Sequence, residues 1–132
     1  KRAEGFPTKL YFWPTVVDDV TPEMLINKEE TFGPVAPIIK FSKIDEAIEI
    51  ANDTPYGLSM AVHTKDLGRA FYFAEKLKAG QVVVNGSVLL WDYHHPWVGI
   101  KRSGVGAVAG KWTIEAFTNI KTILLRPSEP KP

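Results

Sequence analysis

The sequence contains no cysteine among its 132 residues. Disulfide scaffolds, thiolate metal sites and a cysteine nucleophile are therefore excluded within this chain. Histidine is scarce as well, with 3 residues, of which His94 and His95 are adjacent. We therefore expect no histidine-rich metal site.

A large excess of charge is also missing. The 16 basic residues are balanced by 15 acidic residues, which leaves a net charge of +1. A nucleic-acid-binding surface needs basic residues gathered on one face, so nucleic acid is not an expected partner. No apolar run approaches the roughly 20 residues of a membrane span, and the first residues do not resemble a signal peptide. We therefore expect a cytoplasmic protein without a membrane partner.

The composition that is present is that of a globular domain. Hydrophobic residues make up 45% of the chain and charged residues 23%, which are ordinary globular values. The length suits one domain with its own core. No internal repeat or low-complexity tract is evident.

Strand and helix patterns alternate along the first two thirds of the chain. Ile44, Ala47, Ile48 and Ala51 follow the spacing of one buried helix face. This alternation predicts a layered α/β domain. The predicted elements, in order, are an aromatic strand over residues 10–13 that can continue at residues 16–17, a short helical turn over 22–26 capped by Thr21, a strand over 35–41, a helix starting after Ser42, a strand over 58–63, a helix capped by Asp66 and ended by Gly80, and a buried strand over 81–85.

The last third is less regular. Regular periodicity fades after residue 86. Residues 88–91 fit either a short strand or an apolar loop, residues 94–110 are predicted to form a long loop, and a short helix is predicted near residues 111–117. A final strand is predicted over residues 120–125, from Ile120 to Leu125, and it is apolar on both faces. Because the proline-rich tail cannot cover it, we expect this strand to join another sheet, such as one from a second chain.

The stretch EETFGPV at residues 29–35 is conspicuous because two carboxylates and an aromatic ring precede a Gly-Pro break. Gly33 and Pro34 predict a rigid turn that presents Glu30 and Phe32 together. A carboxylate beside an exposed ring suits a nicotinamide riboside. The alternative is a turn with solvated glutamates and a phenylalanine in the core.

Two further patterns are weaker candidates for chemistry. The glycines at 104, 106 and 110 superficially resemble a dinucleotide phosphate loop, but no strand is predicted to run directly into them. The alternative is a loop whose glycines allow close packing. His94 and His95 near Asp92 could serve acid–base chemistry, or form a polar loop tip.

Several motifs together resemble the NAD(P)-dependent aldehyde dehydrogenase superfamily. The sequence PWVGIKRSG at residues 96–104 is similar to the family loop PFGGxKxSG, and the resemblance covers roughly residues 5–125. The other motifs, in the family's order and separations, are EETFGPV at 29–35, NDTPYGL at 52–58, GQVVVN at 80–85 and TNIKT at 118–122.

The resemblance implies a C-terminal portion of such an enzyme. Residues 1–117 would belong to the end of the catalytic domain, and residues 118–132 would be an oligomerisation strand and tail. In the family the cofactor domain and the catalytic cysteine lie upstream, so this chain would be inactive alone. The reaction of the complete enzyme would oxidise an aldehyde to a carboxylic acid through a cysteine thiohemiacetal, with NAD or NADP as the cofactor.

The resemblance also implies roles for particular residues. Glu30 matches the glutamate that accepts hydrogen bonds from the nicotinamide ribose, and Phe32 matches the ring packed near the nicotinamide. Trp97 aligns with an aromatic residue at the mouth of the aldehyde tunnel. The chain would form a homo-oligomer through residues 120–125.

The sequence departs from the family pattern at two places in the last loop. Trp97 and Val98 replace the usual Phe-Gly pair, and Ala107 and Val108 stand where the family commonly has Arg-Glu. Two alternatives to an enzyme portion stay open as well. One is a stand-alone oligomerisation module without catalysis, and the other is a small nucleotide-binding protein that uses residues 104–110.

Overall fold

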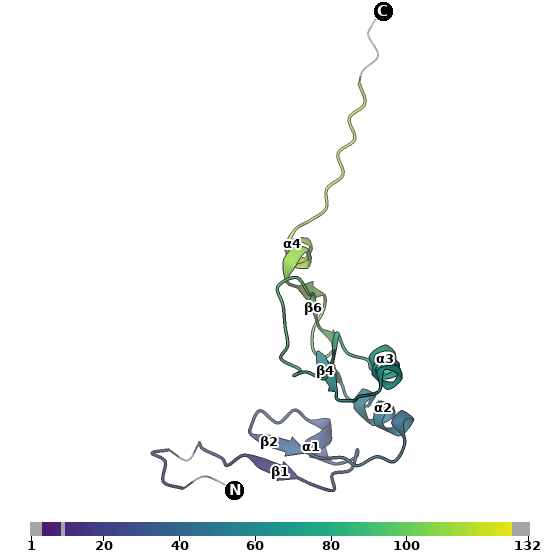
Figure 1. Ribbon diagram of the computed structural model, residues 1–132. Helices are drawn as coiled ribbons and strands as arrows, with labels where there is room; N and C mark the ends of the chain where they lie inside the picture. The colour runs from purple at the N-terminus through teal and green to yellow at the C-terminus, as the bar shows by residue number, and fades with distance from the viewer. Residues whose placement is uncertain (1–3, 9, 128–132) are drawn as a thin grey trace, which may run out of the picture.

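The computed structural model describes residues 4–8 and 10–127 (Figure 1). No helix within these residues is long and apolar enough to cross a bilayer. The elements in chain order are β1 (Thr15–Val17), α1 (Leu25–Lys28), β2 (Val35–Pro37), α2 (Ile44–Asn52), β3 (Tyr56–Gly57), β4 (Ser59–Val62), α3 (Leu67–Lys76), β5 (Gln81–Val84), β6 (Trp97–Val98), β7 (Ile100–Lys101), β8 (Ala107–Val108) and α4 (Gly110–Phe117).

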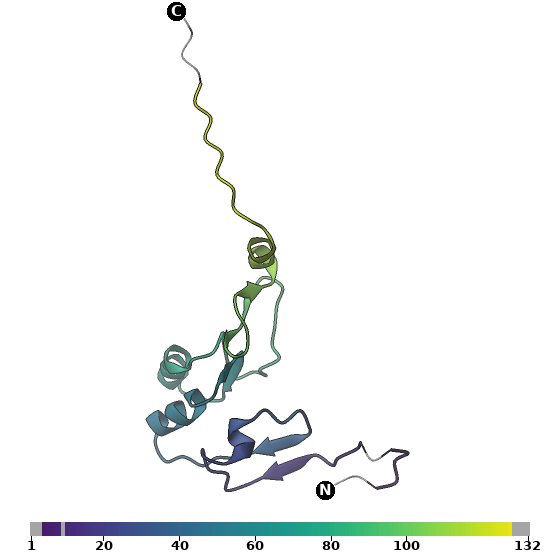
Figure 2. The ribbon, with the colours of Figure 1, turned by 180° about the vertical axis from the view of Figure 1, so that it is seen from behind.

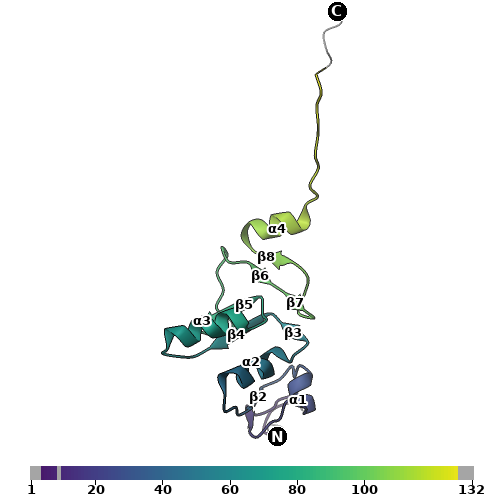
Figure 3. The ribbon, with the colours of Figure 1, turned by 90° about the vertical axis from the view of Figure 1, so that its right-hand side faces the viewer.

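Two parallel strand pairs, each connected through a helix, form the first two thirds of the described chain. β1 pairs with β2 across α1 (Figure 1), and β4 pairs with β5 across α3 (Figure 3). The remaining ladders, β3 with β7 and β6 with β8, are antiparallel. The mixed α/β class is thus confirmed. The pairs do not join into one layered sheet, because each ladder contains two strands only.

Helix α2 begins close to the predicted position. The Glu46 carboxylate accepts hydrogen bonds from the backbone N–H groups of Ser42 (2.8 Å) and Lys43 (3.3 Å). These bonds lower the pKa of Glu46, the bond from Ser42 having the larger effect. Ile48 is buried, as the apolar spacing predicts. Local sequence is therefore sufficient to start this helix.

Helix α3 confirms its predicted cap but not its whole apolar stripe. The Asp66 side chain accepts a hydrogen bond of 2.8 Å from the Arg69 backbone N–H. Ala70 and Leu77 are buried, whereas Leu67 and Phe71 are 72% and 62% exposed, because no segment among the described residues covers that side of the helix. The predicted end at Gly80 is also wrong, since the helix stops at Lys76 and Leu77 is already extended.

The first two predicted strands need correction. The aromatic strand over residues 10–13 is reduced to an isolated bridge at Phe12, whereas the predicted continuation at residues 16–17 is confirmed by β1, which starts at Thr15. The aromatic side chains stack on one another instead, with the Phe6 and Tyr11 ring centroids 4.5 Å apart. The strand predicted over residues 35–41 stops at Pro37, although the Ile38 N–H still bonds to the Val17 carbonyl at 2.8 Å.

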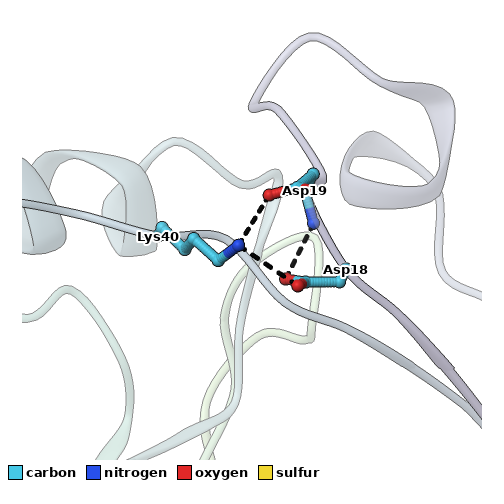
Figure 4. Close-up of polar contacts among 3 residues, drawn as sticks. All are labelled: Asp18, Asp19 and Lys40. Atoms are coloured by element: carbon cyan, nitrogen blue, oxygen red, sulfur yellow. Dashed lines mark hydrogen bonds and ion pairs between the residues drawn. The ribbon is translucent and has the colours of Figure 1, made fainter.

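An ion-pair cluster connects the chain after β1 to the chain after β2. Lys40 Nζ lies 2.7 Å from Asp19 Oδ1 and 3.1 Å from Asp18 Oδ2 (Figure 4). These contacts raise the pKa of Lys40, with Asp19 contributing most. All three side chains are well exposed, so the cluster adds little stability.

The described chain has a small core for its size. Only five hydrophobic residues are buried among the described ones, and the accessible surface is 11195 Å². A compact protein of 14.7 kDa is expected to expose about 6,900 Å². The list of exposed large side chains includes Leu10, Phe32, Leu67 and Phe71. The chain therefore presents much apolar surface that a self-contained domain would bury.

The segment after α4 contributes strongly to this surface. Residues 118–127 run away from the rest of the chain (Figure 2). Ile120 is 99% exposed, and Leu124 and Leu125 are each 88% exposed. The predicted strand over 120–125 is not formed within this chain, because no described segment lies beside it to complete a ladder. Its role in assembly stays a prediction.

Candidate cofactor and substrate site

Three of the sequence motifs meet at a tightly packed junction. The Gly80 N–H donates to the Gly57 carbonyl at 3.0 Å, and the Gln81 N–H donates to the Leu58 carbonyl at 3.0 Å. A Cβ added to Gly80 would lie 1.8 Å from the Val98 carbonyl oxygen, which leaves room for glycine alone. The motifs at 52–58, 80–85 and 96–104 are thus adjacent in space.

The turn after β7 holds the segment between α2 and β4. Tyr56 pairs with Lys101 in the antiparallel β3–β7 ladder. Beyond it, the Arg102 N–H donates to the Pro55 carbonyl at 2.9 Å. The Gly57 N–H donates to Ser103 Oγ at 2.9 Å. These bonds fix the backbone of one wall of a cavity.

That cavity contains Glu30. Its volume is about 470 Å³, and Glu30 enters it from the connection between α1 and β2. Glu30 and Arg102 bring opposite charges to the same space. The other lining residues are Thr54, Tyr56, Gly57, Leu58, Ser59, Met60 and Ser103. A carboxylate in a cavity lined by both polar and apolar side chains can accept hydrogen bonds from ligand hydroxyls, so the residues present fit a ribose.

Sequence reasoning singled out Glu30 but missed its neighbours in the cavity. Tyr56 and Leu58 belong to the motif at 52–58, and Arg102 and Ser103 belong to the motif at 96–104. Their membership of these motifs was the sign in the sequence that could have identified them as residues of the site. Linear spacing alone could not show that both motifs face Glu30.

The turn at residues 29–35 contains two successive tight hydrogen bonds. The Gly33 N–H donates to the Thr31 carbonyl at 2.7 Å, and the Val35 N–H donates to the Gly33 carbonyl at 2.8 Å. Gly33 does not adopt a left-handed φ, so its predicted conformational freedom is not used here. Phe32 is 93% exposed, which contradicts the alternative that it is a core ring. Phe32 does not line the Glu30 cavity.

Trp97 lies in β6, apart from the Glu30 cavity. Its ring centroid is 6.5 Å from that of Trp91 in an edge-to-face arrangement, and Trp91 makes a similar contact with Tyr93 at 4.9 Å. Trp91, Trp97 and Val108 line a second, open cavity of about 290 Å³. The residues before Trp91 form turns, so the loop alternative for 88–91 is confirmed. The rings create an apolar surface suited to an uncharged or aromatic group.

The remaining candidates receive less support. His94 Nδ1 lies 2.8 Å from Asp92 Oδ1, and both side chains are exposed, as in a polar loop tip. Hydrogen bonds from the His94 backbone and then its ring lower the pKa of Asp92. Gly106 and Gly110 have φ values of 84° and 50°, but α4 follows a strand from an antiparallel ladder, unlike the parallel unit of a dinucleotide loop.

Comparison with known proteins identifies the family. Residues 1–123 match the model of the aldehyde dehydrogenase family, so the chain belongs to that family. The resemblance inferred from the motifs is confirmed at this level.

Individual relatives agree with this assignment. The chain is 46% identical over 110 residues to the benzaldehyde dehydrogenase YfmT of Bacillus subtilis, covering 83% of this chain and 23% of that protein. It is 47% identical over 122 residues to a chloroplastic betaine aldehyde dehydrogenase of Atriplex hortensis, covering 92% of this chain and 24% of that protein. The chain thus spans about a quarter of the length of these relatives.

Solved structures share the fold. The aldehyde dehydrogenase KauB from Pseudomonas aeruginosa superimposes with a TM-score of 0.80 at 43% identity, covering 84% of this chain and 22% of that one. A betaine aldehyde dehydrogenase from Staphylococcus aureus in complex with NAD+ gives a TM-score of 0.79 at 42% identity, covering 83% of this chain and 22% of that one.

The junction at Gly80 leads to a stability prediction for the full-length aldehyde dehydrogenase that we propose below to contain this chain, called here the intact enzyme. Gly80→Ala is expected to lower its stability by about 3 kcal/mol, because the new methyl group would collide with backbone. Gly33→Ala is the control, since its Cβ would meet only Thr31 Cγ2 at 3.9 Å. The melting temperature and soluble yield of both variants test this prediction. Equal behaviour of the two variants would contradict the packing described.

Proposed function

We propose that this chain forms the C-terminal part of the catalytic domain of an NAD(P)-dependent aldehyde dehydrogenase. The observation that carries the proposal is the Glu30 cavity, whose walls come from motifs far apart in sequence. The nucleophile and the cofactor domain would lie outside these 132 residues, since the chain contains no cysteine. In the intact enzyme the product would be a carboxylic acid.

We propose that Glu30 holds the nicotinamide ribose. Its charged carboxylate would accept hydrogen bonds from the ribose hydroxyls, while the exposed ring of Phe32 would pack near the nicotinamide. The cofactor, when bound, would supply the hydride acceptor. NAD is supported by the NAD+ complexes of similar proteins from Staphylococcus aureus, and NADP stays an alternative.

We propose that Trp97 contributes to the aldehyde tunnel, with its apolar ring surface next to Val108. The names of relatives include benzaldehyde, betaine aldehyde and aminoaldehyde dehydrogenases, so an aldehyde is the expected substrate class. A cytoplasmic location stays a prediction. Relatives carry the descriptions cytosolic, chloroplastic and peroxisomal.

The isolated chain is expected to show no turnover. Without a nucleophile, Glu30 and Trp97 can position ligands but cannot start the reaction. Incubating the chain with NAD or NADP and a panel of aldehydes, while following absorbance of the reduced cofactor, tests this expectation. Turnover above that of the buffer would refute the proposal that the nucleophile lies outside these residues.

A second candidate is a stand-alone oligomerisation module. The exposed apolar segment at 120–125 favours it, because an unpaired segment of this kind can complete a neighbouring sheet. Light scattering on the same preparation separates the two: a discrete, inactive oligomer supports the module, and a strictly monomeric particle counts against an assembly role for this segment in isolation.

A further inference from the structure

Lys101 has an unusual backbone conformation for its position. Its φ is 54°, in the left-handed region that residues with a side chain seldom adopt. It is nevertheless the last residue of β7 and pairs with Tyr56. Such an outlier persists only where surrounding contacts over-determine it, and it is a reason to examine what the side chain does.

The side chain of Lys101 caps the end of α2. Its Nζ donates to the carbonyl of Asn52, the last residue of the helix, at 3.0 Å and to the carbonyl of Thr54 at 3.1 Å. The last carbonyls of a helix lack partners and carry the negative end of its dipole, so an ammonium group is well suited to this place.

The end of α2 is itself anchored to the end of α3. Asn52 Nδ2 donates to the Lys76 carbonyl at 2.9 Å, and Asn52 Oδ1 accepts from the Lys78 N–H at 2.7 Å. Lys101 therefore ties the β7 turn to a fixed point between two helices. These contacts therefore hold the backbone from which the segment after α2 begins.

The chain that leaves α2 becomes a wall of the Glu30 cavity. Thr54 lines the cavity directly, and residues 56–60 continue the wall. Lys101 does not line the cavity, but it holds the Thr54 carbonyl, and the following Arg102 N–H holds the Pro55 carbonyl at 2.9 Å. Lys101 and Arg102 thus hold the backbone carbonyls at the start of this wall.

We propose that Lys101 is a positioning residue for cofactor binding, which acts by fixing the wall at residues 54–60 opposite Glu30. The inference rests on the proposed function, because it assumes that the cavity receives the nicotinamide ribose. Its consequence is specific: loss of the ammonium group loosens the wall and weakens cofactor binding, while the chemistry carried out elsewhere in the intact enzyme continues once cofactor saturates the site.

The test compares Lys101→Met, Lys101→Gly and Lys101→Arg in the intact enzyme. Lys101→Met is expected to raise the KM and Kd for NAD roughly tenfold, equivalent to losing charge-assisted hydrogen bonds, with kcat at saturating NAD changed less than about threefold. Lys101→Gly relieves the backbone conformation but removes the amino group, so it should resemble Lys101→Met. Lys101→Arg keeps the charge and should recover part of the affinity.

Glu30→Gln, measured in parallel, separates this inference from the proposed function. If Glu30→Gln weakens NAD binding and Lys101→Met or Lys101→Gly does not, the positioning role is wrong and the proposed function stands. If Glu30→Gln has no effect, the proposed function itself fails. Should Lys101→Met not fold, Lys101→Gly decides: an unchanged KM for NAD overturns the proposal, and a rise of about tenfold with kcat retained supports it. A lower melting temperature with an unchanged KM would indicate a structural role only.

Discussion

Replacing Glu30 by glutamine in the intact enzyme is expected to raise the Kd for NAD by about 10- to 100-fold. A hydrogen bond to a charged group contributes about 1.5–3 kcal/mol, and each 1.4 kcal/mol is a factor of ten in affinity. Glutamine has nearly the same shape but lacks the charge, so the effect isolates the carboxylate. Fluorescence titration with the reduced cofactor or calorimetry with NAD measures the change.

Glu29 provides a matched control for this prediction. It is the neighbouring carboxylate and is also exposed, but it does not line the cavity. Glu29→Gln is expected to leave the Kd within about twofold of the parent, since surface charges contribute little. Equal losses in the two variants would mean that the general negative charge of the turn, rather than Glu30, matters for binding.

The isolated 132-residue chain is expected to lack a cooperative thermal transition. Its surface of 11195 Å² exceeds the value for a compact chain of its mass by about 4,300 Å². Burial of apolar surface is the main force that offsets the entropy lost on folding, and here much of that surface stays exposed. Calorimetry should show no sharp peak, and circular dichroism should change gradually on heating.

A cooperative calorimetric peak from the isolated chain would contradict this expectation. A cooperative peak with an enthalpy of about 90 kcal/mol, the usual value of about 0.7 kcal/mol for each residue, would mean that the chain folds independently. A second chain could also supply the cover, so calorimetry should be repeated over a range of protein concentrations. A transition that appears only at high concentration would identify self-association as its source.

Local chemistry explains which parts of the fold were predictable. Asp66 caps α3, and Glu46 in the first turn of α2 accepts hydrogen bonds from the two residues just before the helix, as residue types and spacing indicate. The β5 strand also lies close to its predicted position. Each of these features depends on hydrogen bonds or apolar contacts within a few residues, or on one adjacent helix or strand.

Features that depend on distant partners were not predictable in the same way. Phe71 belongs to a correct helical stripe but is exposed, and Ile120 begins an apolar segment that pairs with nothing in the described chain. In the site, Glu30 was recognised from its motif, whereas Leu58 and Arg102 joined it only through the tertiary arrangement. Sequence spacing does not determine which motif faces which cavity.

The most direct test of the account is a structure of the intact enzyme with NAD bound. The account predicts that both ribose hydroxyls of the nicotinamide half approach the Glu30 carboxylate to about 2.5–2.7 Å, as expected for hydrogen bonds to a charged oxygen. The cavity wall at residues 54–60 should lie on the opposite side of the ribose. A nicotinamide ribose held by other residues, with Glu30 turned to solvent more than about 4 Å away, would contradict the central claim.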